Sequence, residues 1–143
     1  MTLRNILKGK PAGFISVAPD ARVTEVVALL AEKHIGAVLV TDQGKLVGIL
    51  SERDIVRCLA GHGAAALDMT AKALMTSNPS TATPDVSVQQ AMGMMTDGRF
   101  RHLPIIENGA LAGLVSIGDV VKAMIEQSQH EVETLRTYVT GTV

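Results

Sequence analysis

The chain has 143 residues, of which 47% are apolar and 2% aromatic, and its formal charge is −1. This length supports one compact module with a substantial core, and no apolar run approaches the roughly 18 residues of a membrane helix. The lack of basic excess and of stacking side chains excludes a general nucleic-acid binder. A single cysteine forms no internal disulfide and the N-terminus lacks a signal-peptide pattern, so we expect a cytoplasmic protein.

The sequence contains an internal repeat with an offset of 65 residues. The stretch GILSERDIVR at residues 48–57 recurs as GLVSIGDVVK at residues 113–122, and Pro19-Asp20 recurs as Pro84-Asp85. The two copies align without a gap. Because the matches fall on glycine, proline and acidic positions, they indicate a duplication rather than chance.

The first copy predicts the element order β-α-β-β-α. A short extended piece, Phe14–Val17, precedes a helix over Val23–Lys33 whose apolar residues follow a 3.6-residue period. Two strands follow, Ala37–Thr41 and Lys45–Leu50, joined by a turn that contains glycine. The closing helix begins at Glu52, directly after a serine that suits a helix cap.

The second copy predicts the same order. Its elements are an extended piece at Ser80–Thr83, a helix at Val88–Asp97, strands at Leu103–Ile106 and Ala110–Val115, and a helix from Ile117 to about Tyr138. This last helix outruns the repeat and keeps its apolar residues at helical spacing, so we expect it to pack on a partner or along the domain. A glycine or a base ends the first helix of each copy, at Gly36 and at Gly98-Arg99.

Two packed copies form the natural folding unit, because one copy is too small to bury its sheet and both helices. We expect an α/β (α+β) fold in which two repeats are related by pseudo-two-fold symmetry. The first repeat is placed at residues 8–60 and the second at residues 75–126, with a connection at 61–74 and a C-terminal helical extension at 127–143.

Two such units, each ending in glycine, two apolar residues, Ser-x-x-Asp and two aliphatic residues, resemble a tandem pair of cystathionine-β-synthase (CBS) domains, a Bateman module. The resemblance covers residues 14–125, and the run GRFRHLPIIENGALAGLVSIGDVVK is similar to stand-alone CBS-pair proteins of bacteria and plant organelles. It implies an adenosyl ligand between the repeats and head-to-head or head-to-tail dimerisation into a disc.

The two Ser-x-x-Asp turns have two interpretations. Ser51 with Asp54, and Ser116 with Asp119, fit the capping box of a helix start. The resemblance implies instead that each aspartate accepts hydrogen bonds from ribose hydroxyls, while the serine and nearby N–H groups meet phosphate. A helix N-terminus attracts an anion, which suits this second interpretation.

The basic residues differ between the copies. Arg99, Arg101 and His102 precede the second repeat's strand, where they form either a solvated turn or a phosphate clamp. The first copy has no arginine there, but carries Arg53 where the second has Gly118. We therefore expect the two sites to differ in the nucleotide, or in the number of phosphates, that they accept.

The extended pieces are either edge strands or contacts for adenine. With them, the candidate ligand-binding residues are Ser16, Val17, Gly36, Ala37, Val38, Ser51, Arg53, Asp54, Thr81, Thr83, Arg99, Arg101, His102, Leu103, Pro104, Ser116, Ile117, Gly118 and Asp119.

No catalytic motif occurs: the sequence has no Walker A loop, GxGxxG, HExxH, CxxC or GxSxG. We therefore expect no enzyme, catalytic cofactor or metal site. The favoured function is a homodimeric sensor that binds AMP, ADP, ATP or NAD(H), reports energy or redox state and modulates an unknown effector protein, with no nucleic-acid or membrane partner. The alternative is a ligand-independent homodimeric scaffold in which the Ser-x-x-Asp turns only cap helices.

Overall fold

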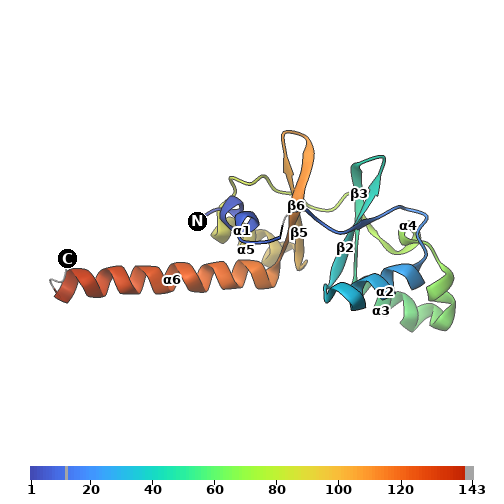
Figure 1. Ribbon diagram of the computed structural model, residues 1–143. Coiled ribbons are helices and arrows are strands. Elements are labelled where there is room, and N and C mark those ends of the chain that lie inside the picture. Colours follow the sequence, from blue (N-terminus) through green and yellow to red (C-terminus); the bar gives the residue numbers. More distant parts are fainter. Residues whose placement is uncertain (12, 141–143) are drawn as a thin grey trace. The chain divides into compact units, whose positions relative to one another are not determined.

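The computed structural model describes residues 1–11 and 13–140. They form two units, one centred on residues 13–80 and the other on residues 1–11, 81–107 and 113–140. Each unit combines helices with a small β-sheet (Figure 1), which confirms the predicted mixed α/β class. None of the helices within the described ranges is both long and apolar enough to span a membrane.

The first unit is built on a sheet with the strand order β1-β2-β3-β4. Its strands are β1 (Ser16–Val17), β2 (Ala37–Asp42), β3 (Lys45–Ser51) and β4 (Thr76–Ser77). β1 runs parallel to β2, and the other pairs are antiparallel. Gln43 and Gly44 both have positive φ, 51° and 80°, as a tight hairpin turn between twisted strands requires. The predicted hairpin is therefore confirmed, with each strand one residue longer than expected.

Helices α2 (Val23–Lys33) and α3 (Glu52–His62) cover this sheet. Val23, Val26 and Leu30, which share one face of α2, are buried against apolar residues of β2, β3 and α3. The periodic pattern in the sequence thus predicted three of the four residues of this face, while Val27, which the pattern also included, is 38% exposed.

The predicted bounds of α2 are confirmed, but the residue expected to terminate it is wrong. α2 ends at Lys33, and the left-handed residue that follows is His34, with φ of 54°, rather than Gly36. Gly36 has another role, because its carbonyl accepts the backbone N–H of Glu52 at 3.0 Å and so ties the entry of β2 to the start of α3.

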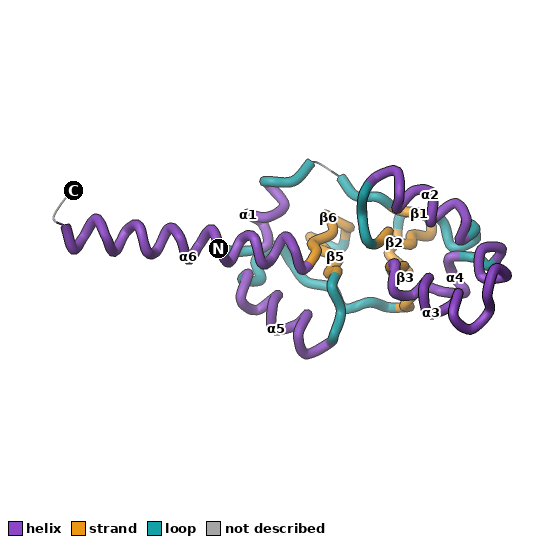
Figure 2. Tube along the Cα trace, turned by 90° about the horizontal axis from the view of Figure 1, so that it is seen from below, coloured by secondary structure: helices purple, strands orange, loops and turns teal. Residues whose placement is uncertain are grey.

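The second unit holds a two-stranded sheet and three helices. Its elements are α1 (Leu3–Lys8), α5 (Val88–Gly98), β5 (His102–Glu107), β6 (Ala110–Ser116) and α6 (Ile117–Thr140). Asn108 and Gly109 repeat the positive φ values of the first hairpin. α6 packs against α5 and α1 over its first turns, and its remaining turns project from the unit (Figures 1 and 2).

The extended piece expected at Ser80–Thr83 is shorter than predicted. Only one isolated parallel bridge forms, between Ala82 and Ile105. The first repeat pairs here through the N–H of Leu39, which donates to the carbonyl of Ile15 at 3.0 Å. The second repeat has Pro104 in the place of Leu39, and proline has no N–H to donate, so the pairing is truncated.

Helix α1 is a feature that the sequence analysis missed. Its backbone docks on the second repeat, since the N–H of Leu3 donates to the carbonyl of Val86 and the N–H of Arg4 to that of Pro84, both at 2.9 Å. Leu3 is fully buried. The N-terminal segment therefore completes the later repeat rather than the one that follows it in the chain.

Helix α4 (Ala71–Leu74), which follows the 3-10 helix η1 (Gly63–Asp68), makes the matching contacts on the first repeat. The N–H of Ala71 donates to the carbonyl of Ala21 at 2.7 Å, and that of Lys72 to the carbonyl of Pro19 at 2.9 Å. Each repeat is thus completed by a short helix that precedes the other repeat in sequence.

The first glycine of the repeated motif makes room for these short helices. A Cβ added at Gly48 would lie 2.9 Å from Cγ of Met75 and 3.0 Å from the carbonyl oxygen of Thr76, just after α4. A Cβ added at Gly113 would lie 2.7 Å from Cδ2 of Leu7 on α1. The glycine that begins each of the two motifs therefore has a packing reason, which is separate from any ligand.

Candidate functional site

In the first repeat, Ser51 and Asp54 form a closed capping box at the start of α3. Ser51 Oγ accepts the N–H of Asp54 at 3.3 Å, while Asp54 Oδ2 accepts the N–H of Ser51 at 2.9 Å and its hydroxyl at 3.0 Å. All contacts of the carboxylate use Oδ2. No hydrogen bond reaches Oδ1 from residues 1–11 or 13–140, so this oxygen can accept a ligand hydroxyl without breaking the cap.

The second repeat has the same box with one addition. Ser116 Oγ accepts the N–H of Asp119 at 3.1 Å, and Asp119 Oδ2 accepts the N–H of Ser116 at 2.9 Å. Lys10 Nζ donates to the same Oδ2 at 2.7 Å and to the carbonyl of Leu114 at 2.9 Å. The sequence analysis missed Lys10, which is 109 residues from Asp119. Here too, the described part of the chain leaves Oδ1 without a donor.

The charge state of Asp119 is set by opposing effects. Burial, the largest effect, raises the pKa of the carboxyl, but the hydrogen bonds from Lys10 and Ser116 and the positive charge of Lys10 together lower it below its ordinary value. Asp119 is therefore an anion at neutral pH, and its side chain is only 26% exposed.

We expect Lys10→Met to lower the free energy of unfolding by about 0.5–1 kcal/mol at pH 7, because the ion pair is partly exposed. Since the folded-state pKa of Asp119 is depressed, the stabilisation is complete above the ordinary aspartate pKa of about 3.9 and is lost as the pH falls through the folded value. Urea unfolding between pH 7 and pH 3 measures this difference.

Lys8→Met is the matched control, since Lys8 is an exposed lysine in the same segment. It should leave the pH dependence unchanged. A stability difference between wild type and Lys10→Met that stays constant down to pH 3 would contradict the role of the Asp119 charge.

The helix starts are linked to two other candidate residues. In the first repeat the carbonyl of Gly36 accepts the N–H of Glu52. In the second repeat the backbone carbonyl of Arg101 accepts the N–H of Ile117 in the same way, at 2.8 Å. Arg101 is exposed. The backbone of Arg101 therefore lies next to the turn that begins at Ser116. The phosphate clamp by its side chain stays a prediction.

The remaining candidates differ in what they can offer. Ala37, Val38, Leu103 and Pro104 are buried in the core, so their side chains are not accessible to a ligand. Ser16, Arg53, Thr81, Thr83, Arg99 and Gly118 are exposed, and Val17, His102 and Ile117 are half-buried. Ser16 and Val17 lie on β1, and Ala82 bonds to the carbonyl of Pro104, which holds Thr81 and Thr83 alongside β5.

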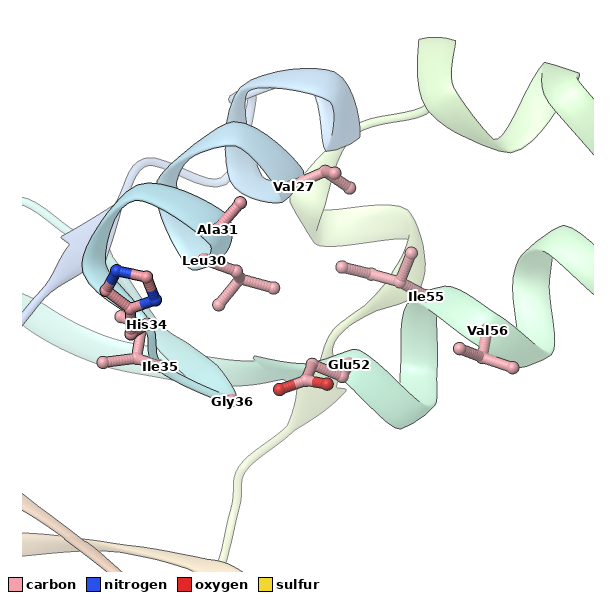
Figure 3. Close-up of a pocket in the computed structure, with 9 residues that line it drawn as sticks. All are labelled: Val27, Leu30, Ala31, His34, Ile35, Gly36, Glu52, Ile55 and Val56. Carbon is pink, nitrogen blue, oxygen red and sulfur yellow. The ribbon is translucent and has the colours of Figure 1, made fainter.

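A separate apolar groove of about 510 Å³ lies between α2 and α3 (Figure 3). Val27 and Leu30 of α2 face Ile55 and Val56 of α3 across it. Val56 is 62% exposed, and its counterpart in the second repeat, Val121 on α6, is 41% exposed. The described ranges contain no group of three or more His, Cys, Asp or Glu side chains placed to hold a metal ion.

Residues 11–61 and 71–126 match the CBS domain. The chain belongs to the CBS-domain family. The mitochondrial CBS domain-containing protein CBSX3 of Arabidopsis thaliana is 34% identical over 141 residues, which cover 94% of this chain and 68% of that protein. The resemblance to CBS pairs stated from the motifs is thereby confirmed.

Solved CBS structures share the fold. The CBS-domain protein ATU1752 of Agrobacterium tumefaciens has a TM-score of 0.84 and 43% identity, covering 87% of this chain and 99% of that one. The CBS-domain protein PAE2072 of Pyrobaculum aerophilum, solved in complex with AMP, has a TM-score of 0.74 and 29% identity, covering 83% of this chain and 89% of that one.

Proposed function

We propose that this CBS pair is a non-catalytic regulatory module that binds an adenine nucleotide, AMP, ADP, ATP or NAD(H), and modulates a partner protein. The observation that carries the proposal is that the two oxygens of each aspartate carboxylate have different contacts. Oδ2 of Asp54 and of Asp119 holds the helix cap, and Oδ1 is left to accept a ribose hydroxyl. Capping and ligand binding therefore do not compete for the same atom. The AMP bound to the Pyrobaculum protein supports the ligand class.

The two sites of the proposal are unequal. Lys10 adds a positive charge beside Asp119, whereas no lysine or arginine within the described residues forms an ion pair with Asp54. Arg101 stands at the start of the second motif's helix, and Arg53 lies inside the first motif. The second site has more fixed positive charge, so we assign the ligand with more phosphate groups to it.

The module acts as a homodimer in this proposal. Val56 and Val121 occupy equivalent places in the two repeats, and both are exposed aliphatic side chains on helices. Apolar side chains left uncovered at equivalent places favour burial against a second copy. The cytoplasmic location stays a prediction, and the Arabidopsis relative is described as mitochondrial.

A ligand titration separates the sensor from the scaffold. AMP, ATP, NADH and S-adenosylmethionine are titrated calorimetrically into the wild-type protein, with thermal unfolding in each ligand as a second readout. We expect saturable binding of at least one ligand and a matching rise in Tm. Absence of heat and of a Tm shift with all four would favour the scaffold, in which the Ser-x-x-Asp turns only cap helices.

Arg101→Ala should weaken binding of a multiply phosphorylated ligand about 10-fold and reduce the salt dependence of its Kd, because a charge-assisted contact to phosphate is lost. Arg101→Lys, which keeps the charge but not the bidentate geometry, should lie between wild type and alanine. Adenosine, which has no phosphate, is the control ligand. Equal weakening for adenosine and ATP would contradict a phosphate clamp at Arg101.

A further inference from the structure

Helix α6 carries along its length an apolar stripe that its own unit leaves exposed. We call it the tail seam, and its residues are Val121, Ile125, Ser128, Val132, Leu135 and Val139. Leu135 is 63% exposed and Val139 is 74% exposed. Every described residue from Ser128 to Thr140 is exposed. Figure 1 shows this part of α6 projecting from its unit. A continuous stripe of exposed aliphatic side chains is typical of a surface that binds a partner.

The seam is distinct from the face that packs on the unit itself. Val120 and Ala123 of α6 are buried there, at 0% and 5% exposed. The seam residues follow one another at alternating steps of four and three, which is the heptad spacing of a coiled coil. Ile125, Val132 and Val139 then take position a, and Val121, Ser128 and Leu135 take position d.

We infer that the tail seam pairs with the tail seam of a second copy of this chain, as a parallel, in-register, two-stranded coiled coil. Every a position is β-branched, and Leu135 stands at d. β-branched residues at a with leucine at d favour two parallel strands over higher oligomers. Ser128 is the one polar layer of the seam.

The charges beside the seam decide its direction. Position g holds Glu131 and position e holds Arg136, five residues later. In a parallel pair, g of one helix meets e of the next heptad on its partner, so each Glu131 meets the Arg136 of the other copy, twice per dimer. An antiparallel pair would set g against g and e against e, and the charged side chains there would meet neutral residues or their own sign.

Two shallow depressions that are open to solvent lie along the seam. A shallow groove of about 540 Å³ runs past Ile117, Val121 and Ile125, and one of about 370 Å³ runs past Val132 and Arg136. Both depressions follow the same stripe, so the described part of the chain leaves this side of the helix uncovered.

About three heptads form a marginal coiled coil by themselves. The pairing therefore rests on the homodimer of the proposed function, which raises the effective concentration of the two helices to the millimolar range. It also fixes the arrangement of that dimer, because parallel α6 helices place second repeat against second repeat. It does not depend on any nucleotide.

Disulfide trapping in the full chain tests the pairing. In a Cys58→Ser background, single cysteines are introduced as Leu135→Cys on the seam and Thr137→Cys on the outer face. Both positions are exposed in the single chain, so reactivity alone does not separate them. We expect Leu135→Cys to form the interchain disulfide at least 10-fold faster. If the two variants form the interchain disulfide at equal rates while sedimentation shows a dimer, the coiled-coil pairing is overturned but the homodimer is not.

A second cross-linking experiment tests whether the two helices run parallel. Val121→Cys chains are mixed with Val139→Cys chains that carry a tag of different length, so that the disulfide-linked products can be told apart by size. A parallel seam gives the two homodisulfides, whereas an antiparallel seam gives the heterodisulfide, which would overturn the proposed direction. A monomer by sedimentation would overturn both this inference and the homodimer, without bearing on the nucleotide titration.

A charge exchange provides the matched control. Glu131→Arg alone and Arg136→Glu alone should each slow Leu135→Cys cross-linking about fivefold, because each creates two like-charge contacts per dimer. The double variant Glu131→Arg/Arg136→Glu should recover to within about twofold of the starting rate. A double variant as slow as the single ones would overturn the pairing of these two residues. Circular dichroism confirms that each variant keeps its helix content.

Discussion

Asp54→Ala and Asp119→Ala will each raise the Kd of the nucleotide held by that repeat about 10- to 100-fold. A hydrogen bond to a charged group contributes about 1.5–3 kcal/mol, and the substitution removes the acceptor that a ribose hydroxyl would use. In both repeats Oδ2 is occupied by the cap, so the loss falls on Oδ1. Isothermal titration with the ligands that bind wild type measures the two Kd values separately.

The alanine variants also lose a helix cap, which costs about 0.5–2 kcal/mol of stability. Asp54→Asn separates the two effects. Its amide oxygen can still accept the N–H of Ser51, while the amide nitrogen takes the place of Oδ1 and turns an acceptor into a donor. We expect the asparagine variant to unfold close to the wild-type temperature and still to bind nucleotide poorly.

The scaffold alternative predicts the opposite pattern. If Asp54 only caps α3, Asp54→Asn should behave as wild type in every assay and Asp54→Ala should differ only in stability. Nucleotide binding that survives alanine at both aspartates would place the ligand elsewhere in the chain. If the Asp54 and Asp119 variants lose the binding of different ligands, this would support two sites with different ligand preferences, as the presence of Lys10 beside Asp119 alone suggests.

Gly48→Ala will lower the free energy of unfolding by about 1–3 kcal/mol, the usual cost of overpacking a core. The added Cβ would lie 3.0 Å from the carbonyl oxygen of Thr76, which is backbone in strand β4 and is paired with the neighbouring Ile49. Met75 contacts the same position, so the methyl group has no free side to occupy. Urea unfolding followed by circular dichroism gives the change.

Gly113→Ala is the matched control, because it has the same position in the second motif and is equally buried. Its Cβ would meet only side-chain atoms of Leu7, at the end of a flexible side chain on α1. Leu7 can turn away, so we expect a loss below about 1 kcal/mol. A larger effect at Gly113 than at Gly48 would contradict this account.

The repeat and its central elements could be predicted from the sequence because they depend on local signals. α2 and the starts of α3 and α6 fall where periodicity and the Ser-x-x-Asp turns place them. The hairpins depend on Gly44 and Gly109, whose positive φ values glycine adopts without strain. The residue that terminates α2 could not be predicted from glycine, because His34 takes the left-handed conformation there, as Arg99 does at the end of α5.

Helix α1 and the role of Lys10 could not be predicted in the same way. α1 is a short helix whose stability comes from docking on residues 84–86, far along the chain. Its counterpart α4 is displaced by three residues from the 65-residue offset, as Thr2 pairs with Ser87 and Thr70 with Arg22. A search for a second offset, comparing TLRNILK with TAKALMT, is the signal that would have revealed it.

The docking of α1 on the second repeat affects the order in which segments acquire their native contacts during synthesis. Residues 13–80 contain all the strands of their own sheet and can fold as soon as they leave the ribosome. α1 is synthesised before them but finds its partners only when Pro84, Val86 and Glu107 have emerged, the last of which holds Arg4 at 2.7 Å. Helix α1 is therefore among the last segments to acquire its native contacts, although it is synthesised before residues 13–80.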